Sequence, residues 1–456
     1  MPKLNVRIGL EIHVPLKTKE KLFCHCPANY YETEEPNVNV CPVCTGMPGA
    51  KPFPINSKAL MAAILIAKLL NCKIPNKMIF VKRKHYDYPD LPSGYQRTSE
   101  PIGINGELSG VRIWEVHLEE DPGRYDLLTG KVDYNRSGAP LVEIVTAPDM
   151  KSAEEVREFL KELLNLLRYS EVILDIGGVL RADVNISLEG GSRVEIKNIN
   201  SIKGAYKAIN YEIMRQKNLM KRGIEVRRET RGYNEKSMIT FSLRTKETEE
   251  DYRYIPDPDI PPLILTSELV DVPLPETPQL RRERIVKEYG IPEKYAKILV
   301  KDKHLADLFE IVAKNIDPNL AASWICREVL RQLNYRSIEL RESKLNAEIL
   351  EDLLSLLTAK KITENTAKKL LERVIDTGEL PSKIVEEENL ERVADENLLE
   401  AVISEVVAKN EKAVLDYKSG KKEALNFLLG QVMKEMRGKA DPKVAIKLLL
   451  EKIEKY

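Results

Sequence analysis

The 456-residue sequence has no apolar run long enough to cross a bilayer, and its first residues lack the apolar stretch that a signal peptide requires. A membrane-spanning or secreted protein is therefore not indicated, and we expect a soluble, cytoplasmic chain. Lysine and arginine together number 71, as do aspartate and glutamate, so the formal net charge is zero. Net charge thus points to no nucleic-acid partner, and a surface for one would have to be a local patch.

Three common catalytic signatures are also missing. The sequence has no Gly-x-x-x-x-Gly-Lys-[Ser/Thr] phosphate loop, no Gly-x-Ser-x-Gly nucleophile elbow and no Gly-x-Gly-x-x-Gly dinucleotide loop. A Walker-type nucleotide site and a serine hydrolase are therefore not indicated. Cys72 and Cys326 lie in apolar surroundings, which is typical of core thiols rather than of nucleophiles.

The other four cysteines form two close pairs, Cys24-x-Cys26 and Cys41-x-x-Cys44. Two thiol pairs on short turns are the usual way of building a tetrahedral Zn²⁺ site. Disulfides are the alternative, and the absence of a secretory signal argues against them. Because four thiolates leave no coordination position for substrate, we expect a structural zinc that braces its loop. His25 is a possible substitute ligand of lower rank.

A strand beginning at Ile8 brings an acid and an imidazole together. Apolar residues at positions 8, 10, 12 and 14 alternate with Gly9, Glu11 and His13. Since side chains along a strand switch faces at every residue, Glu11 and His13 project from the same face. A Glu-x-His pair on a strand is by itself more often a solvated surface than a site.

Further alternating segments predict an antiparallel sheet with an acidic polar face. They cover residues 103–124, 140–145, 180–190 and 193–200. Their polar residues include Glu119, Glu120, Glu143, Asp183, Asn185, Glu195 and Lys197. Gathered carboxylates repel one another unless cations lie among them, and Mg²⁺ commonly joins protein carboxylates to substrate phosphates. Each acid alone is best explained as a surface residue, but together they favour a metal–phosphate cleft.

Helices and loops are predicted around these strands. We expect a helix over Asn56–Asn71 with Asn56 or Ser57 as its N-cap, and a helix over Ser152–Ser170 with Ser152 as its N-cap. The segment Val81–Thr98 reads as a proline-stiffened loop whose basic and aromatic residues suit phosphates and stacked bases, although such a loop is often only a surface turn. The proline-dense stretch Pro256–Pro278 can be neither a helix nor a central strand, and it predicts a domain boundary. Helical spacing of apolar residues dominates after it.

The C-terminal segment has an excess of basic residues. They are Lys418, Lys421, Lys422, Lys434, Arg437, Lys439 and Lys443, and Gly438 and Pro442 indicate a turn between two helices. A basic helical hairpin can contact nucleic acid through its phosphates. The alternative is a solvated helix face whose apolar stripe packs on the preceding helices.

Motifs that are long and specific occur along the chain, namely IGLEIH, CPVCTGMPGA, YPDLPSGYQ, HLEEDPG, NRSGAPLVEIV, RADVNIS, EIKNINS, DYRYIPDPDIPP and FLLGQVMKEMRGKADP. They closely resemble the motifs of B subunits of the tRNA-dependent Asp/Glu amidotransferase. The resemblance covers essentially the whole chain in the right order. The related archaeal E subunit carries an inserted domain near the sheet-to-helix boundary, and the short stretch Pro256–Pro278 leaves no room for one. The B subunit is therefore the better match.

The resemblance implies an α+β fold in three parts. These are a cradle-shaped catalytic domain with an antiparallel sheet and a zinc loop over residues 1–290, a helical domain over 291–395, and a tRNA-binding helical tail over 396–456. It also implies a ligase subunit that uses ATP and Mg²⁺ to phosphorylate the side-chain carboxylate of misacylated Asp-tRNA(Asn) or Glu-tRNA(Gln). Ammonia would come from glutamine through an amidase (glutaminase) A subunit, with a small C subunit completing a heterotrimer.

The resemblance also implies roles for individual residues. Glu11, His13 and Glu120 are the first candidates for catalysis and metal binding, and Lys197 is the candidate for neutralising phosphate charge. The remaining cofactor-binding candidates are Glu119, Glu143, Asp183, Asn185 and Glu195, and the zinc ligands are Cys24, Cys26, Cys41 and Cys44. The alternative hypothesis is a zinc-braced tRNA-binding scaffold without chemistry of its own, which would not need the carboxylates.

Overall fold

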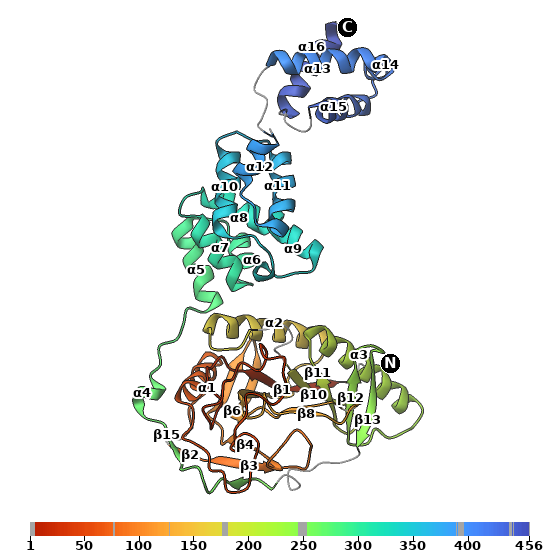
Figure 1. The fold of residues 1–456 in the computed structure, drawn as a ribbon. Coiled ribbons are helices and arrows are strands. Elements are labelled where there is room, and N and C mark those ends of the chain that lie inside the picture. The colour runs from red at the N-terminus through yellow and green to blue at the C-terminus, as the bar shows by residue number, and fades with distance from the viewer. Residues whose placement is uncertain are drawn as a thin grey trace. The chain divides into compact units, whose positions relative to one another are not determined.

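The computed structural model describes residues 5–75, 78–126, 128–175, 181–244, 253–388, 390, 396–436, 440 and 442–455. The chain divides into two compact units, Met1–Thr277 and Pro278–Tyr456. Every described strand lies in the first unit, and the described secondary structure of the second is helical (Figure 1). The predicted α+β class, with an antiparallel sheet followed by helices, is confirmed. No helix in the described ranges combines the length and the apolar character needed to cross a membrane.

One large sheet forms the centre of the first unit, and 11 strands belong to it among the described residues. Their order across the sheet is β13 (Ile239–Arg244), β12 (Glu229–Asn234), β11 (Val194–Ile199), β10 (Arg181–Leu188), β1 (Val6–Pro15), β9 (Pro140–Thr146), β6 (Val111–Glu120), β4 (Tyr95–Ser99), β3 (Val81–His85) and β14 (Ile255–Pro256), with β5 (Gly103–Leu108) paired to β6. Neighbours are antiparallel except β11 and β12, which are parallel. Two short pairs, β2 (Met78–Ile79) with β15 (Leu263–Ile264) and β7 (Arg124–Tyr125) with β8 (Val132–Asp133), lie outside it.

The two faces of this sheet differ in chemistry, and β1 shows why. Ile8, Leu10, Ile12 and Val14 are at most 1% exposed. They share one hydrophobic core with α1 (Ser57–Leu69), α2 (Ala153–Ser170) and α3 (Ile202–Lys221), and Figure 1 shows α2 and α3 covering the same face of the sheet. Strand side chains alternate between faces, so the polar residues of β1 are directed to the face that this core does not occupy.

The predicted helix starts are confirmed by their caps. The Asn56 side chain accepts hydrogen bonds from the backbone amides of Lys58 and Ala59 at the start of α1. The Ser152 side chain accepts one from the amide of Glu155 at the start of α2. Each cap satisfies backbone donors that the first helical turn leaves free, and such a cap contributes about 1 kcal/mol.

The segment Val81–Thr98 is not the single loop predicted from its composition. Its ends form the paired strands β3 and β4, in which Lys82 lies opposite Thr98 and Lys84 lies opposite Gln96. The prediction was wrong because the polar side chains of this segment contact buried partners within the sheet. The polar character of the segment therefore does not indicate that it is exposed to solvent. The stretch Pro256–Pro278 also contains more structure than predicted, namely the edge strand β14, the short strand β15 and the one-turn helix α4 (Ser267–Val270).

The helices of the second unit form two separate hydrophobic cores. The first core joins α5 (Pro278–Tyr289), α6 (Glu293–Leu299), α7 (Lys303–Val312), α8 (Pro318–Trp324), the π-helical turn Ile325–Val329, α9 (Leu330–Arg336), α10 (Ala347–Thr358), α11 (Glu364–Thr377) and α12 (Pro381–Glu387). The second joins α13 (Glu396–Lys409), α14 (Glu411–Lys418), α15 (Glu423–Glu435) and α16 (Pro442–Lys455). The division at 290 and 395 stays a prediction, and α5 lies in the second unit rather than in the first.

The basic residues predicted for the tail are only partly described. Lys418, Lys421, Lys422 and Lys434 are exposed. Arg437, Gly438 and Lys439 lie outside the described residues, as does the side chain of Lys443. The turn predicted around Gly438 therefore also lies outside the described residues.

Candidate active site on the polar face of the sheet

The register of three strands brings distant polar residues together. His13 in β1 lies opposite Glu143 in β9, and Glu11 lies opposite Asp183 in β10. Directly opposed residues in an antiparallel pair have Cβ atoms about 4.5–5.5 Å apart and share a face. The predicted common face of these residues is therefore confirmed in its geometry.

The first group on this face consists of His13, Glu119 and Glu143, whose ligand atoms lie within 4.8 Å of one another. The His13 Nε2 to Glu143 Oε1 distance is 3.5 Å. Glu119 accepts hydrogen bonds from the Thr98 hydroxyl at 2.8 Å and the Gln96 amide at 3.0 Å. An imidazole and two carboxylates that converge in this way are a suitable ligand set for a divalent cation.

The residues of this group shift one another's pKa values. Burial, reinforced by the charge of Glu143, raises the pKa of Glu119. Burial also opposes ionisation of Glu143, but the hydrogen bond and charge of His13 outweigh it and hold the pKa of Glu143 below its usual range. The same pair raises the pKa of His13 against the effect of burial. The charges of Lys84 and His117 lower the pKa of Glu143 further, and a bound cation would favour the ionised form of both carboxylates.

A second group lies beside the first and consists of Glu11, Asp183 and Glu195, again within 4.8 Å of one another. Asn185 donates a hydrogen bond to Glu11 at 2.9 Å. The Lys197 ammonium lies between the other two acids, 3.2 Å from Asp183 and 2.8 Å from Glu195. Their charges raise the pKa of Lys197 although its burial opposes this. Lys197 already compensates part of the charge of this group.

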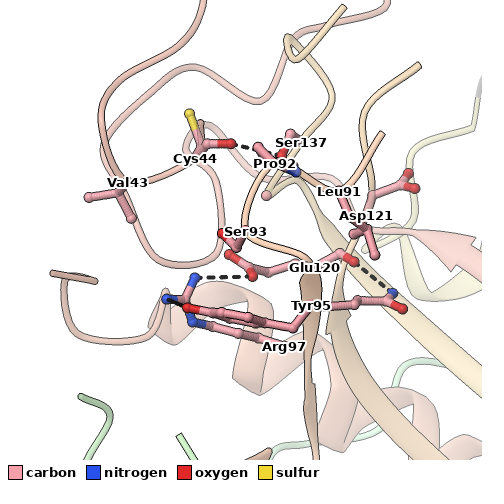
Figure 2. Close-up of a pocket in the computed structure, with 12 residues that line it drawn as sticks. Val43, Cys44, Leu91, Pro92, Ser93, Tyr95, Arg97, Glu120, Asp121 and Ser137 are labelled. Carbon is pink, nitrogen blue, oxygen red and sulfur yellow. Dashed lines mark hydrogen bonds and ion pairs between the residues drawn. The ribbon is translucent and has the colours of Figure 1, made fainter. Parts of the chain in front are cut away.

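Glu120 does not join either group, so the prediction that it shares the face of Glu119 is wrong. It follows Glu119 directly in β6, so its side chain leaves the strand on the opposite face. Its carboxylate lies 3.3 Å from Arg97 Nη1. Figure 2 shows Glu120 beside Arg97 and Tyr95 in a pocket that Cys44 also lines. The volume of this pocket is about 20 Å³.

The four predicted zinc ligands converge. The thiols of Cys24, Cys26, Cys41 and Cys44 lie within 4.8 Å of one another, and all four are free. The Cys44 sulfur is 3.9 Å from that of Cys41 and 4.0 Å from that of Cys26. Tetrahedral Zn–S bonds of about 2.3 Å require sulfur atoms about 3.8 Å apart, so the four-cysteine cluster fits a zinc ion. The lower-ranked His25 is directed elsewhere, and its ring pairs with Glu20 at 2.9 Å.

Sequence reasoning missed three residues around the first group. Gln96 and Thr98 were assigned to a loop, although both hold Glu119. His117 lies opposite Glu143 in the β6–β9 register, and its ring nitrogens contact the Ser99 carbonyl oxygen at 2.9 Å and Glu115 at 3.1 Å. The hydrogen bond with Glu115 outweighs burial and raises the pKa of His117 to about 9. The sequence did contain the information needed to place His117 on the polar face, because His117 stands two residues before Glu119 in an alternating strand.

Comparisons with known proteins identify the family of this chain. The family model described as "GatB/GatE catalytic domain" matches residues 6–271, which include both carboxylate groups and the four-cysteine cluster, and the model "GatB domain" matches residues 307–453. The B subunit of the aspartyl/glutamyl-tRNA(Asn/Gln) amidotransferase from Methanocaldococcus jannaschii is 53% identical over 100% of this chain and 99% of its own length. The B subunits of the same name from Methanopyrus kandleri and Methanothermobacter thermautotrophicus are each 52% identical, over 99% and 98% of this chain and 99% and 100% of their own lengths.

The chain belongs to the family of aspartyl/glutamyl-tRNA(Asn/Gln) amidotransferase B subunits. This confirms the resemblance found in the motifs, including the choice of the B subunit. As a B subunit, the chain is part of a multi-subunit amidotransferase. Its polar sheet face, which lies within the catalytic-domain match, is therefore the candidate active site.

Proposed function

We propose that this chain activates the side-chain carboxylate of Asp-tRNA(Asn), Glu-tRNA(Gln) or both, with ATP as co-substrate. A carboxylate oxygen attacks the γ-phosphorus, the bond between that phosphorus and the bridging oxygen breaks, and ADP leaves. Ammonia then attacks the carbonyl carbon of the acyl phosphate, the carbon–oxygen bond breaks, inorganic phosphate leaves, and loss of a proton gives the amide. Activation is needed because a free carboxylate offers ammonia no acceptable leaving group.

The observation that carries this proposal is the pairing of two acidic groups on one sheet face. Phosphoryl transfer depends mainly on positioning and on neutralising the charge of the transferred group. In the first group, Glu119 and Glu143 supply the carboxylate oxygens that Mg²⁺ prefers, and the imidazole of His13 lies beside them. When bound, Mg²⁺ would offset the charge of these acids and of the nucleotide phosphates. A binding scaffold without chemistry would have no use for buried, mutually repelling acids.

The residues of the second group have a supporting role in the proposal. Asp183 and Glu195 hold the Lys197 ammonium at the polar face, where it can neutralise phosphate charge. Asn185 fixes the orientation of Glu11. We do not include Glu120 among these residues, because its carboxylate is committed to Arg97 on the other face.

The other components of the enzyme are also part of the proposal. Ammonia would be released from glutamine by an amidase A subunit, and a small C subunit would complete the heterotrimer. The four-cysteine cluster would hold a structural Zn²⁺, and the helices from α13 onward would contact the tRNA backbone.

The test is amide formation on misacylated tRNA with an ammonium salt as the nitrogen source, which removes the need for glutamine. We expect ADP and amidated aminoacyl-tRNA to form together, and only when ATP and Mg²⁺ are present. Running the assay with both tRNAs gives the substrate preference. Tight binding of misacylated tRNA without any ADP would support the scaffold alternative instead.

A further inference from the structure

A buried lysine contacts the four-cysteine cluster. Lys21 is 1% exposed, which is rare for a lysine whose charge is not compensated. Its ammonium lies 2.8 Å from the carbonyl oxygen of Asn39, 3.3 Å from that of Tyr134 and 3.4 Å from the sulfur of Cys44. An ammonium has three N–H donors and no acceptor. All three donors are therefore used, and the Cys44 sulfur is an acceptor.

None of the three partners of Lys21 is a carboxylate. Across the described part of the chain, no aspartate or glutamate forms an ion pair with this ammonium. A buried ammonium surrounded only by neutral groups would be strongly unfavourable. Among the three partners, the Cys44 sulfur is the one that can carry negative charge.

The zinc-loaded cluster would supply that charge. Four thiolates around one Zn²⁺ leave an excess of about two negative charges, and a site of this kind needs hydrogen-bond donors around its sulfurs. The Cys41 amide donates to the Cys44 sulfur at 3.2 Å, and Lys21 adds a charged donor to the same atom. The Lys21 amide also donates to the Cys26 carbonyl oxygen at 3.0 Å, so this residue contacts both cysteine pairs.

We propose that Lys21 is the counter-ion of the four-cysteine metal site. Its ammonium offsets part of the negative charge of the zinc tetrathiolate and stabilises Cys44 as a thiolate ligand. Because it acts on the metal through Cys44, Lys21 is a positioning residue rather than a ligand. The inference rests on the zinc assignment in the proposed function and is independent of the amidation chemistry.

The test compares two variants of the full-length chain that both alter a contact with Cys44. Lys21→Met removes the charge at the sulfur and keeps most of the side-chain volume. Ser137→Ala is the matched control, because the Ser137 hydroxyl donates to the Cys44 carbonyl oxygen at 2.8 Å and carries no charge (Figure 2). Zinc affinity is measured by competition with a chromogenic chelator. We expect Lys21→Met to weaken zinc binding by about 10–100-fold and Ser137→Ala to change it by less than about threefold.

Cobalt substitution separates this role from a merely structural one. Loss of a hydrogen bond to Cys44 raises the energy of its sulfur lone pairs, so the sulfur-to-cobalt charge-transfer band of Lys21→Met should move to longer wavelength. That of Ser137→Ala should stay in place. Equal zinc affinity and an unshifted band in Lys21→Met would overturn the role of Lys21 while leaving the zinc assignment intact. A wild-type chain that binds no zinc would overturn both.

A measurement on the wild-type chain covers the case in which Lys21→Met does not fold. Cys24 and Cys44 are each 5% exposed, but among these two only Cys44 accepts from Lys21. A thiolate that accepts a charged hydrogen bond is a weaker nucleophile. With zinc bound, iodoacetamide should therefore modify Cys44 more slowly than Cys24, as followed by mass spectrometry of peptides. Modification of Cys44 at the same rate as Cys24, or faster, would contradict the proposal.

Discussion

The four-cysteine cluster and the polar sheet face are both candidate metal centres, but they are assembled in opposite ways. The cysteines come from two turns of one segment and supply soft sulfur ligands that close a tetrahedral site. The polar face collects hard oxygen and imidazole ligands from strands far apart in the chain, and a cation bound there would keep positions free for phosphate. The first arrangement suits a structural metal, and the second suits chemistry.

If this contrast holds, damage to the polar face should affect the reaction far more than the fold. His13→Ala removes the imidazole that pairs with Glu143 at 3.5 Å. We expect ADP formation in the presence of misacylated tRNA to fall by about 10²–10³-fold. Zinc content and tRNA affinity should stay unchanged, because tRNA affinity comes from distributed phosphate contacts. Glu158→Gln on the exposed surface of α2 is the control, and wild-type ADP formation by His13→Ala would show that the site is misplaced.

Glu119 and Glu120 sharpen the contrast, since they are neighbours on opposite faces of β6. Glu119→Gln should lower ADP formation by about 10²-fold, because it removes an acid of the first group. Glu120→Gln should lower it by less than about tenfold, because its carboxylate is directed to the other face. Steady-state rates of ADP release would be compared for both variants at saturating ATP. Equal losses would mean that the face of the sheet does not define the site.

Substitutions in the four-cysteine cluster should affect the stability of the fold more than the reaction. Cys41→Ser should lose the zinc ion and lower the melting temperature on the order of 10 °C, because a structural metal contributes folding free energy directly. Metal analysis and thermal unfolding would be measured beside Cys72→Ser, which removes a thiol outside the cluster and should keep the zinc. A Cys41→Ser protein with normal zinc and stability would exclude the proposed structural role.

The tail should affect the reaction least. Removal of residues 396–456 takes away a separate hydrophobic core and the exposed Lys418, Lys421, Lys422 and Lys434. We expect weaker tRNA binding and a log–log salt slope that is shallower by roughly 0.7–0.9 per lost phosphate contact. ADP formation at saturating tRNA should persist, since the tail supplies none of the carboxylates. Equal affinity and slope in both proteins would leave the tail as a structural appendage.

The four-cysteine cluster and the polar sheet face also differ in how much of each could be predicted from the sequence. The cysteine pairs, the caps at Asn56 and Ser152 and the two faces of β1 depend on local spacing, and the sequence predicted all of them. The pairing of Glu11 with Asp183 and of His13 with Glu143 depends on strand register, which joins residues more than a hundred positions apart. Local patterns therefore identified the residues but not how they divide into two groups.

The errors have physical causes that can be named. Glu120 was placed with Glu119 because consecutive acids resemble one cluster, although strand geometry separates them. Lys84, Gln96 and Thr98 were assigned to a loop, because the sequence does not distinguish polar residues that contact one another within a sheet from solvent-exposed ones. The role of Lys197 at the phosphate stays a prediction, and its ion pairs with Asp183 and Glu195 could not be read from spacing alone.

The central claim is that the side-chain carboxylate is phosphorylated, and isotope transfer tests it most directly. Asp-tRNA(Asn) carrying ¹⁸O in its side-chain carboxylate would be incubated with the assembled enzyme, ATP, Mg²⁺ and an ammonium salt. The account predicts that one ¹⁸O atom from each carboxylate appears in inorganic phosphate for every amide formed. Amide formation with unlabelled phosphate would contradict it.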